Sequence, residues 1–209
     1  MKKVNYQREL DMLLAKLAGE RDEGKKSPRL LLHSCCAPCS SYCIEYLSGY
    51  FDITVFYYNP NLYPDEEYIK RVREQEHFIE LFDKKIKFVE GDFEKELFYE
   101  TVRGFEDEPE RGKRCALCFG LRLSKTADMA KREGFDYFAT TLTISPQKDA
   151  GLINRIGQSI SDDVGVCYLA SDFKKKNGYK RSVELSNEYG MYRQDYCGCR
   201  FSVRKADPK

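Results

Sequence analysis

Cysteines are the residues of this chain whose spacing most clearly predicts chemistry. Nine occur in 209 residues, and seven of them fall into three short groups at residues 35–39 (Cys-Cys-Ala-Pro-Cys), 115–118 (Cys-Ala-Leu-Cys) and 197–199 (Cys-Gly-Cys). Two thiolates at the start of a helix point the same way, and the free N–H groups of that helix end favour their anionic form. Two such groups can close a four-sulfur site, which fits either a tetrahedral zinc ion or an iron–sulfur cluster.

Spacing favours different roles for the individual cysteines. Cys35 and Cys36 are adjacent, whereas zinc ligands are generally separated by about two to four residues, and this difference favours a cluster. Cys39 follows one helical turn later and is a candidate spare ligand, ligand of a second metal or catalytic thiol. Cys43 and Cys167 lie in apolar runs and are expected to be small, buried hydrophobic residues.

The third cysteine group favours redox chemistry. Gly198 between Cys197 and Cys199 permits the strained turn that a disulfide between such near neighbours requires. A strained disulfide is easily reduced, which suits a redox relay better than a structural bridge. Metal ligation by the same two cysteines is the alternative. The two histidines, His33 and His77, are too few for a histidine-rich metal site, and His77 is expected at the surface or at its boundary.

A basic segment precedes the last cysteine group. The net charge of +1 predicts no partner, but it hides an acidic stretch at residues 64–110 (8 basic, 16 acidic) and a basic one at 174–209 (10 basic, 4 acidic). Cations interleaved with tyrosines suit a phosphate backbone and stacked bases, while a merely solvated face is the alternative. The candidate RNA contacts are Lys148, Lys174, Lys175, Lys176, Lys180, Arg181 and Arg193.

Composition bounds the class of protein. The 42% hydrophobic and 33% charged content is ordinary for a globular chain and excludes a disordered or fibrous one. The sequence has no 18-residue apolar run, and its N-terminal residues do not resemble a signal peptide, so we expect a cytoplasmic protein with no membrane segment. A reducing compartment disfavours structural disulfides and favours metal binding or redox catalysis by the cysteines.

Strand and helix patterns alternate along the chain. Strands are expected at 29–33, 53–58, 86–89, 136–141 and 166–169, and helices at 5–18, 37–47, from about 64, shortly after 92, around 115–123 and at 152–160. This order predicts an α/β fold of the Rossmann-like type, with a doubly wound, mainly parallel sheet and helices on both faces. We expect one α/β domain over 1–209, with an N-terminal helix and loop in 1–28 and a basic C-terminal segment in 172–209.

Such a sheet binds ligands at the carboxyl ends of its strands. There the cysteine loop, residues 59–61, Asp92 and the loop at 141–149 are expected to converge. The first strand is followed by cysteines instead of a glycine-rich phosphate loop, so ATP is not expected.

Four motifs together resemble the cobalamin-independent epoxyqueuosine reductases, the QueH family. They are His-Ser-Cys-Cys-Ala-Pro-Cys at 33–39, Arg-Cys-Ala-Leu-Cys-Phe-Gly-Leu-Arg-Leu at 114–123, Thr-Thr-Leu-Thr-Ile-Ser-Pro-Gln-Lys-Asp at 140–149, and the stretch 172–201. They occur in the expected order over about 170 residues, which leaves only the first 28 or so residues outside the resemblance.

The resemblance implies a 4Fe-4S enzyme that reduces epoxyqueuosine to queuosine at the wobble position of tRNA with electrons from an external donor. Its cluster ligands fall on Cys35, Cys36, Cys115 and Cys118, and its redox-active pair on Cys197 and Cys199. It also implies the nucleotide-alpha-hydrolase-like fold of tRNA-thiolating enzymes. Opening the epoxide takes two electrons and releases water; an additional iron near Cys39 is expected to serve as Lewis acid, with Asp92 or Asp149 as ligand or proton donor. Both carboxylates are alternatively helix caps.

Two other classes of protein account for part of this pattern. A zinc-stabilised RNA-binding module explains the thiols and the basic segment but leaves the separate Cys-Gly-Cys unexplained. A thiol–disulfide oxidoreductase explains Cys-Gly-Cys and Cys-Ala-Leu-Cys but leaves Cys35 and Cys36 without a role. Iron, sulfide and zinc analysis separates the three.

Overall fold

A parallel sheet forms the centre of the protein in the computed structural model, which describes residues 4–194 and 196–202. Parts of the expected N-terminal region (1–3) and of the basic C-terminal segment (195 and 203–209) lie outside the described residues. The strands are β1 (Arg29–His33), β2 (Asp52–Tyr57), β3 (Lys87–Glu90), β4 (Tyr137–Thr140) and β5 (Cys167–Tyr168). All pairs are parallel in the order β3-β2-β1-β4-β5, so the chain crosses between strands through helices.

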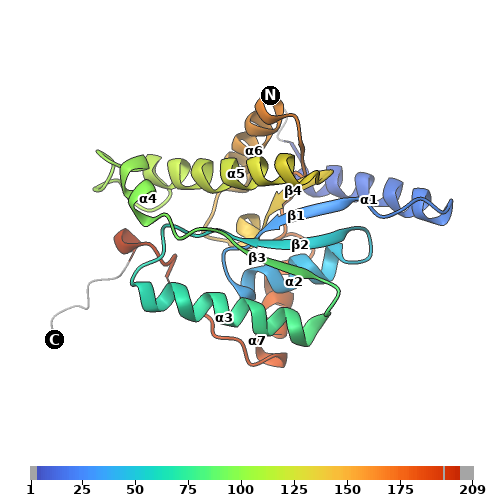
Figure 1. Ribbon diagram of the computed structural model, residues 1–209, viewed down its shortest axis with the longest axis horizontal. Coiled ribbons are helices and arrows are strands. Elements are labelled where there is room, and N and C mark those ends of the chain that lie inside the picture. The colour runs from blue at the N-terminus through green and yellow to red at the C-terminus, as the bar shows by residue number, and fades with distance from the viewer. Residues whose placement is uncertain (1–3, 195, 203–209) are drawn as a thin grey trace.

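Helices cover both faces of this sheet (Figure 1). One face packs against α5 (Lys113–Glu133) and α6 (Ala150–Val164) through a core that includes Leu31, Leu123 and Phe138. The other packs against α1 (Tyr6–Asp22), α2 (Ala37–Leu47), α3 (Asp65–Phe82) and α7 (Gly178–Glu188) through a second core. The short α4 (Lys95–Thr101) packs against α5. The doubly wound α/β prediction is therefore confirmed.

The structure corrects one local prediction and shows one helix that was not predicted. Cys167 is exposed, because β5 is a two-residue edge strand whose alternation turns Tyr168 inward and Cys167 outward. Helix α7 had no predicted counterpart; its buried face consists of Gly178, Ser182, Leu185 and Ser186, so it lacks the aliphatic stripe that identifies a helix in sequence. These small residues let α7 pack closely against α2.

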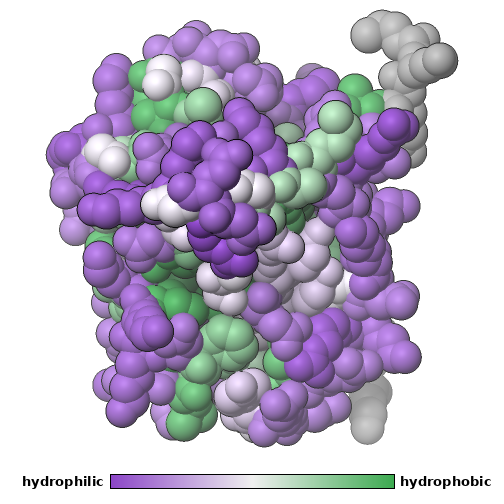
Figure 2. All heavy atoms as spheres, turned by 90° about the vertical axis from the view of Figure 1, so that its right-hand side faces the viewer, coloured by the Kyte–Doolittle hydropathy of each residue, from purple (hydrophilic) through white to green (hydrophobic). Residues whose placement is uncertain are grey.

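The outer surface is mostly polar. The end of the molecule seen in Figure 2 is largely hydrophilic, with hydrophobic side chains in small patches. Among residues 4–194 and 196–202, none of the helices combines the length and apolarity needed to cross a membrane.

A substitution at Gly157 tests how tightly α6 packs on the edge of the sheet. A Cβ atom at this position would lie 2.4–2.6 Å from ring atoms of the buried Tyr168. We expect Gly157→Ala to lower the free energy of unfolding by about 1–3 kcal/mol, because the clash outweighs alanine's higher helix propensity. The measurement is urea unfolding.

Gly120 is the matched control, since it also lies inside a helix but has nothing within 4 Å of its would-be Cβ. Gly120→Ala should raise the stability by up to about 1 kcal/mol. Equal effects of the two substitutions would contradict the packing argument.

Candidate functional site

Two adjoining cavities lie where the chain leaves the carboxyl ends of β1, β2 and β4. The larger, of about 360 Å³, is lined by residues that include Cys35, Cys39 and Arg122. The smaller, of about 30 Å³, is lined by residues that include Cys115, Cys118, Cys197 and Cys199. Lys148 and Cys197 line both. All three cysteine groups therefore lie around one region, at the end of the molecule that holds the start of α5 in Figure 1.

The first cysteine group forms a compact set of sulfur ligands. Cys35 lies in the turn after β1, Cys36 is the N-cap of α2 and Cys39 lies in the first turn of that helix. Their sulfur atoms all lie within 4.8 Å of one another, a geometry that could hold a metal ion. Within residues 4–194 and 196–202, no other group of three His, Cys, Asp or Glu residues meets this criterion.

Hydrogen bonds favour a negative charge on this group. The thiols of Cys36 and Cys39 donate to Cys35 and lower its pKa, while their own pKa values are raised because they act as donors. The Thr141 hydroxyl donates to the Cys35 sulfur over 3.5 Å, and Gln194 Nε2 donates to the Cys36 sulfur over 3.1 Å. The group can therefore be anionic although it is largely shielded from water.

The second cysteine group, at the start of α5, also meets donors. The backbone N–H of Arg111 donates to the Cys115 sulfur over 3.3 Å. Burial raises the pKa of Cys118 to about 11, and the Arg122 guanidinium, one helical turn further along α5, opposes that rise. Each of the four sulfurs assigned as cluster ligands by resemblance thus has a hydrogen-bond donor or a cation beside it.

The Cys-Gly-Cys segment docks against the loop that follows β2. Cys199 forms an antiparallel bridge with Leu62, and the Tyr63 N–H donates to the Gly198 carbonyl over 2.9 Å. Gly198 has a φ of 97°, and a Cβ there would lie 2.5 Å from a Leu62 methyl carbon, so only glycine fits this turn. Cys199, packed beside Cys118, is buried.

Cys197 and Cys199 are both free thiols, and their pKa values are shifted in opposite directions. The Cys199 thiol donates to Cys197, and Lys148 and Arg122 add positive charge nearby, so the pKa of Cys197 is lowered although burial opposes this. The same hydrogen bond raises the pKa of Cys199. Cys197 is therefore the member of the pair suited to be the nucleophilic thiolate.

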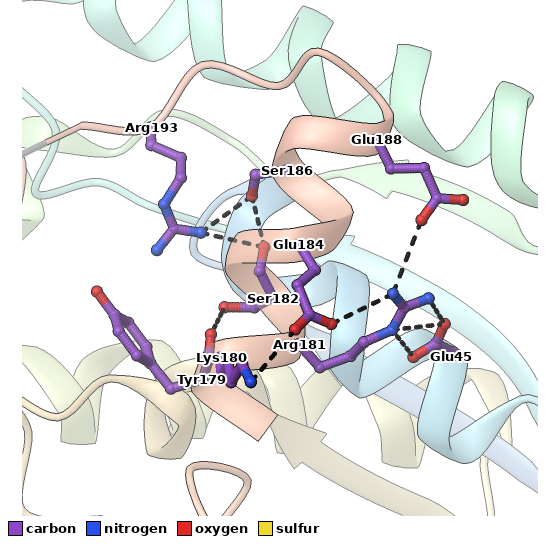
Figure 3. A network of polar contacts seen from close by, with 9 residues as sticks. All are labelled: Glu45, Tyr179, Lys180, Arg181, Ser182, Glu184, Ser186, Glu188 and Arg193. Carbon is purple, nitrogen blue, oxygen red and sulfur yellow. Dashed lines mark hydrogen bonds and ion pairs between the residues drawn. The ribbon is translucent and has the colours of Figure 1, made fainter. Parts of the chain in front are cut away.

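Ion pairs neutralise much of the predicted RNA-binding segment. Lys174 lies 2.6 Å from Asp172, Lys176 lies 2.7 Å from Asp11, and Lys180 reaches Glu184 at 4.0 Å. Arg181 donates to both carboxylate oxygens of Glu45 on α2 and also pairs with Glu184 and Glu188, as Figure 3 shows. Lys175 is exposed and forms no ion pair with the residues that the structure describes.

Two other predicted cations face the larger cavity instead. The Arg193 guanidinium donates to Ser182 and Ser186 on α7, and lies 5.6 Å from the ring centroid of Tyr179 (Figure 3). Lys148 has no side-chain partner among the described residues, and both cations line the cavity with Tyr179 and Cys35. These uncompensated cations beside tyrosine suit an anionic, aromatic ligand.

The two candidate carboxylates lie in different surroundings. Asp149 lines the smaller cavity, but its Oδ1 caps α6 by accepting from the N–H groups of Gly151 and Leu152. Asp92 is exposed between β3 and α4 and does not line either cavity. His77 is exposed and Cys43 is buried, as predicted.

Several residues that surround the sulfurs were not among the predicted site residues. Arg122 and Arg71 are both buried, and Gln194 and Thr141 donate to sulfur. Cys118 and Arg122 are four residues apart and therefore lie on one face of α5. This spacing could have predicted that Arg122 lies beside Cys118. The others reach the site only through tertiary folding.

Comparison with known proteins gives one consistent family. Residues 30–205 match the family model described as "Epoxyqueuosine reductase QueH". The chain is 42% identical over 209 residues to the epoxyqueuosine reductase QueH of Staphylococcus epidermidis, covering 97% of this chain and 86% of that protein. It is 44% identical over 207 residues to that of Staphylococcus aureus (96% and 85%), and 44% identical over 206 residues to that of Streptococcus pyogenes (97% and 79%).

The lowered pKa of Cys197 predicts its reactivity. Iodoacetamide should alkylate Cys197 rapidly at neutral pH, because the thiolate is the reacting form. The alkylation rate should fall only at a pH well below the pKa of an ordinary thiol. Lys148→Gln removes a stabilising cation and should shift this profile to higher pH. Peptide mass spectrometry measures the rate at each pH.

Cys199→Ala removes the hydrogen-bond donor that is the strongest single cause of the lowered Cys197 pKa, and it should shift the profile in the same direction. A Cys197 profile centred near the ordinary thiol value of about 8.5 and unmoved by both substitutions would contradict the assignment.

Proposed function

The chain belongs to the epoxyqueuosine reductase QueH family, and from that premise we propose how its residues reduce epoxyqueuosine to queuosine at the wobble position of tRNA. The reaction takes two electrons and two protons, breaks both C–O bonds of the epoxide, forms an alkene and releases the oxygen as water. The protein therefore has to hold an electron-transfer group, present the epoxide to it and supply protons. We propose that the reaction takes place in the cytoplasm, where tRNA and reduced thiols are found.

A 4Fe-4S cluster held by Cys35, Cys36, Cys115 and Cys118 is the proposed electron-transfer group. The donor set supports it: four cysteines come from two helix starts, and each sulfur meets a donor or a cation. Hydrogen bonds to sulfur are a means by which proteins tune such clusters. When bound, the cluster supplies electrons one at a time to a reaction that consumes two.

Cys39 remains beside this ligand set as a third thiol of the first group. We propose it as the ligand of an additional iron, supported by its sulfur lying within 4.8 Å of those of Cys35 and Cys36. Asp149 is retained as candidate proton donor because it lines the adjoining cavity, and Lys148 carries the positive charge suited to a developing negative charge on the departing oxygen.

Cys197 and Cys199 are the proposed redox pair. The Cys197 thiolate lines both cavities, and Cys199 packs against Cys118, so the pair lies next to the proposed cluster ligands. Oxidation of the two thiols to a disulfide releases two electrons and two protons, which matches the demand of one turnover. An external electron donor would then reduce the disulfide.

The tRNA contacts are proposed to divide into two sets. Lys148 and Arg193, with Tyr179, line the larger cavity and would receive the modified nucleotide and a neighbouring phosphate. Lys174, Lys175, Lys176 and Lys180 line neither cavity and would contact phosphates further along the RNA. Arg181 would act mainly by fixing α7 to α2 through Glu45.

Cysteine substitutions test the cluster and the redox pair together. In protein purified without oxygen, Cys115→Ser should lose iron, sulfide and the charge-transfer absorption, because one cluster ligand is removed. Cys199→Ser should keep all three and lose multiple-turnover reduction. Exposed Cys167 offers the control, since Cys167→Ser should change neither property.

Full iron and sulfide in both Cys115→Ser and Cys118→Ser would contradict the ligand assignment. Steady-state turnover with Cys197 and Cys199 both replaced would contradict the redox pair.

Salt dependence of tRNA binding tests the two sets of contacts. Arg193→Gln should flatten the slope of log affinity against log salt concentration by about 1 unit, because one phosphate contact is lost. Replacing Lys174, Lys175 and Lys176 by alanine should flatten the slope by less than three such contacts, since two of these lysines already pair with Asp172 and Asp11.

Arg132→Ala provides the control, because Arg132 is exposed in the last turn of α5. Slopes equal to that of the unsubstituted protein in both test variants would show that these cations form only a solvated face.

A further inference from the structure

Arg122 is a buried cation that lacks an acidic partner. Its side chain is 2% exposed, and no carboxylate lies within ion-pair distance of it among the described residues. Its Nε donates to His33 Nε2 over 3.2 Å, and its Nη2 donates to Asn59 Oδ1. Both acceptors are uncharged, so they satisfy the hydrogen bonds of the guanidinium without offsetting its charge.

The other buried arginines are compensated in ordinary ways. Arg71 lies 2.7 Å from the Glu67 carboxylate. Arg114 has no carboxylate partner either, but the dipoles of three backbone carbonyls point at it and its Cζ lies 4.8 Å from the ring centroid of Phe201, which offsets much of its charge. A buried charge without a counter-charge is unfavourable, and Arg122 has neither a carboxylate nor an aromatic ring beside it in the described part of the chain, so an anion of another kind would offset its charge.

The groups that face Arg122 identify that anion. Cys118 lies one helical turn before Arg122 on α5, and Cys35 and Cys197 line the larger cavity together with the arginine. His33 adds no positive charge, because its Nε2 accepts the hydrogen bond from Arg122 and therefore carries no proton. The charge opposite Arg122 is therefore the charge of the sulfur site itself.

We propose that Arg122 is a positioning residue that raises the reduction potential of the cluster, an inference that rests on the proposed cluster. A 4Fe-4S core of charge 2+ bound to four thiolates has a net charge of −2, and uptake of one electron from a low-potential donor makes it −3 without forming or breaking a bond. A fixed positive charge stabilises the more negative state more strongly. Its burial keeps water and salt from screening this effect.

Asn59 and His33 hold the guanidinium in place for this role. The Asn59 amide also donates to the Ser34 carbonyl over 2.9 Å, next to Cys35, so the arginine is tied to the loop that carries the first two proposed ligands. His33 is the last residue of β1 and lies within the sheet. The cation is thus fixed by the framework and does not depend on flexible surface groups.

Redox titration of the holoenzyme tests the proposal. After reconstitution without oxygen and confirmation of iron and sulfide content, the cluster is titrated with dithionite and its reduced form is quantified by electron paramagnetic resonance. Arg122→Gln should make reduction at least tenfold less favourable, which is about 59 mV for one electron. Arg122→Lys keeps the charge and should stay within about threefold of the unsubstituted protein, roughly 30 mV.

Asn59→Asp is a second variant that leaves the arginine in place. It adds a carboxylate of the same shape against Nη2, offsets the guanidinium charge, and should lower the potential in the same direction as Arg122→Gln. The control is Lys131→Gln, which removes an exposed positive charge from the far end of α5 and should leave the potential unchanged.

An unchanged potential in Arg122→Gln or Asn59→Asp with full iron and sulfide would overturn the proposal. Loss of the cluster from both variants would also overturn it, because Arg122 would then be needed to hold the cluster instead of setting its potential. Absence of iron and sulfide from the unsubstituted protein would contradict the proposed function itself, which keeps the two failures distinguishable.

Discussion

Several cysteine sulfur atoms lie together, largely out of water, at one edge of a parallel sheet, and two of them, those of Cys35 and Cys197, have lowered pKa values. Such a group is costly to bury unless cations and hydrogen-bond donors surround it. Much of the local structure answers this requirement. Arg122 approaches from α5, the Thr141 hydroxyl from the end of β4, and Gln194 from the segment after α7. The elements that carry these donors are therefore constrained by the charge of the sulfurs as well as by packing.

The parallel sheet meets this requirement because it gathers distant segments at one edge. His33, Asn59 and Thr140 follow or end three adjacent strands, and their side chains form one hydrogen-bonded network with Arg122. The α2 and α5 helices start at the same edge, so their first-turn cysteines face the same region. The Cys-Gly-Cys segment then closes the region from the side of the loop after β2.

The fold and the cysteine groups could be predicted from sequence because their signals are local. Buried strands are recognised as apolar runs, and the cysteine groups are recognised by their spacing at the starts of helices. Helix α7 could not be predicted in this way, since its buried face is made of small residues that pack against α2. The exposure of Cys167 depends on which residue of a two-residue strand faces inward, which only the packing of Tyr168 decides. Likewise, the ion pairs that neutralise Lys174 and Lys176 involve partners chosen by tertiary folding, Asp11 being 165 positions away from Lys176.

The hydrogen bond that Gln194 donates to the Cys36 sulfur joins residues 158 positions apart. During synthesis, the first cysteine group therefore leaves the ribosome well before the segment that donates to it and covers it. Chains grow at about 5–20 residues per second, so Cys35, Cys36 and Cys39 spend roughly ten seconds or more without this partner. For that interval the thiols are open to metal, oxidant or assembly factor, and the order in which the chain emerges sets when the site can first be sealed.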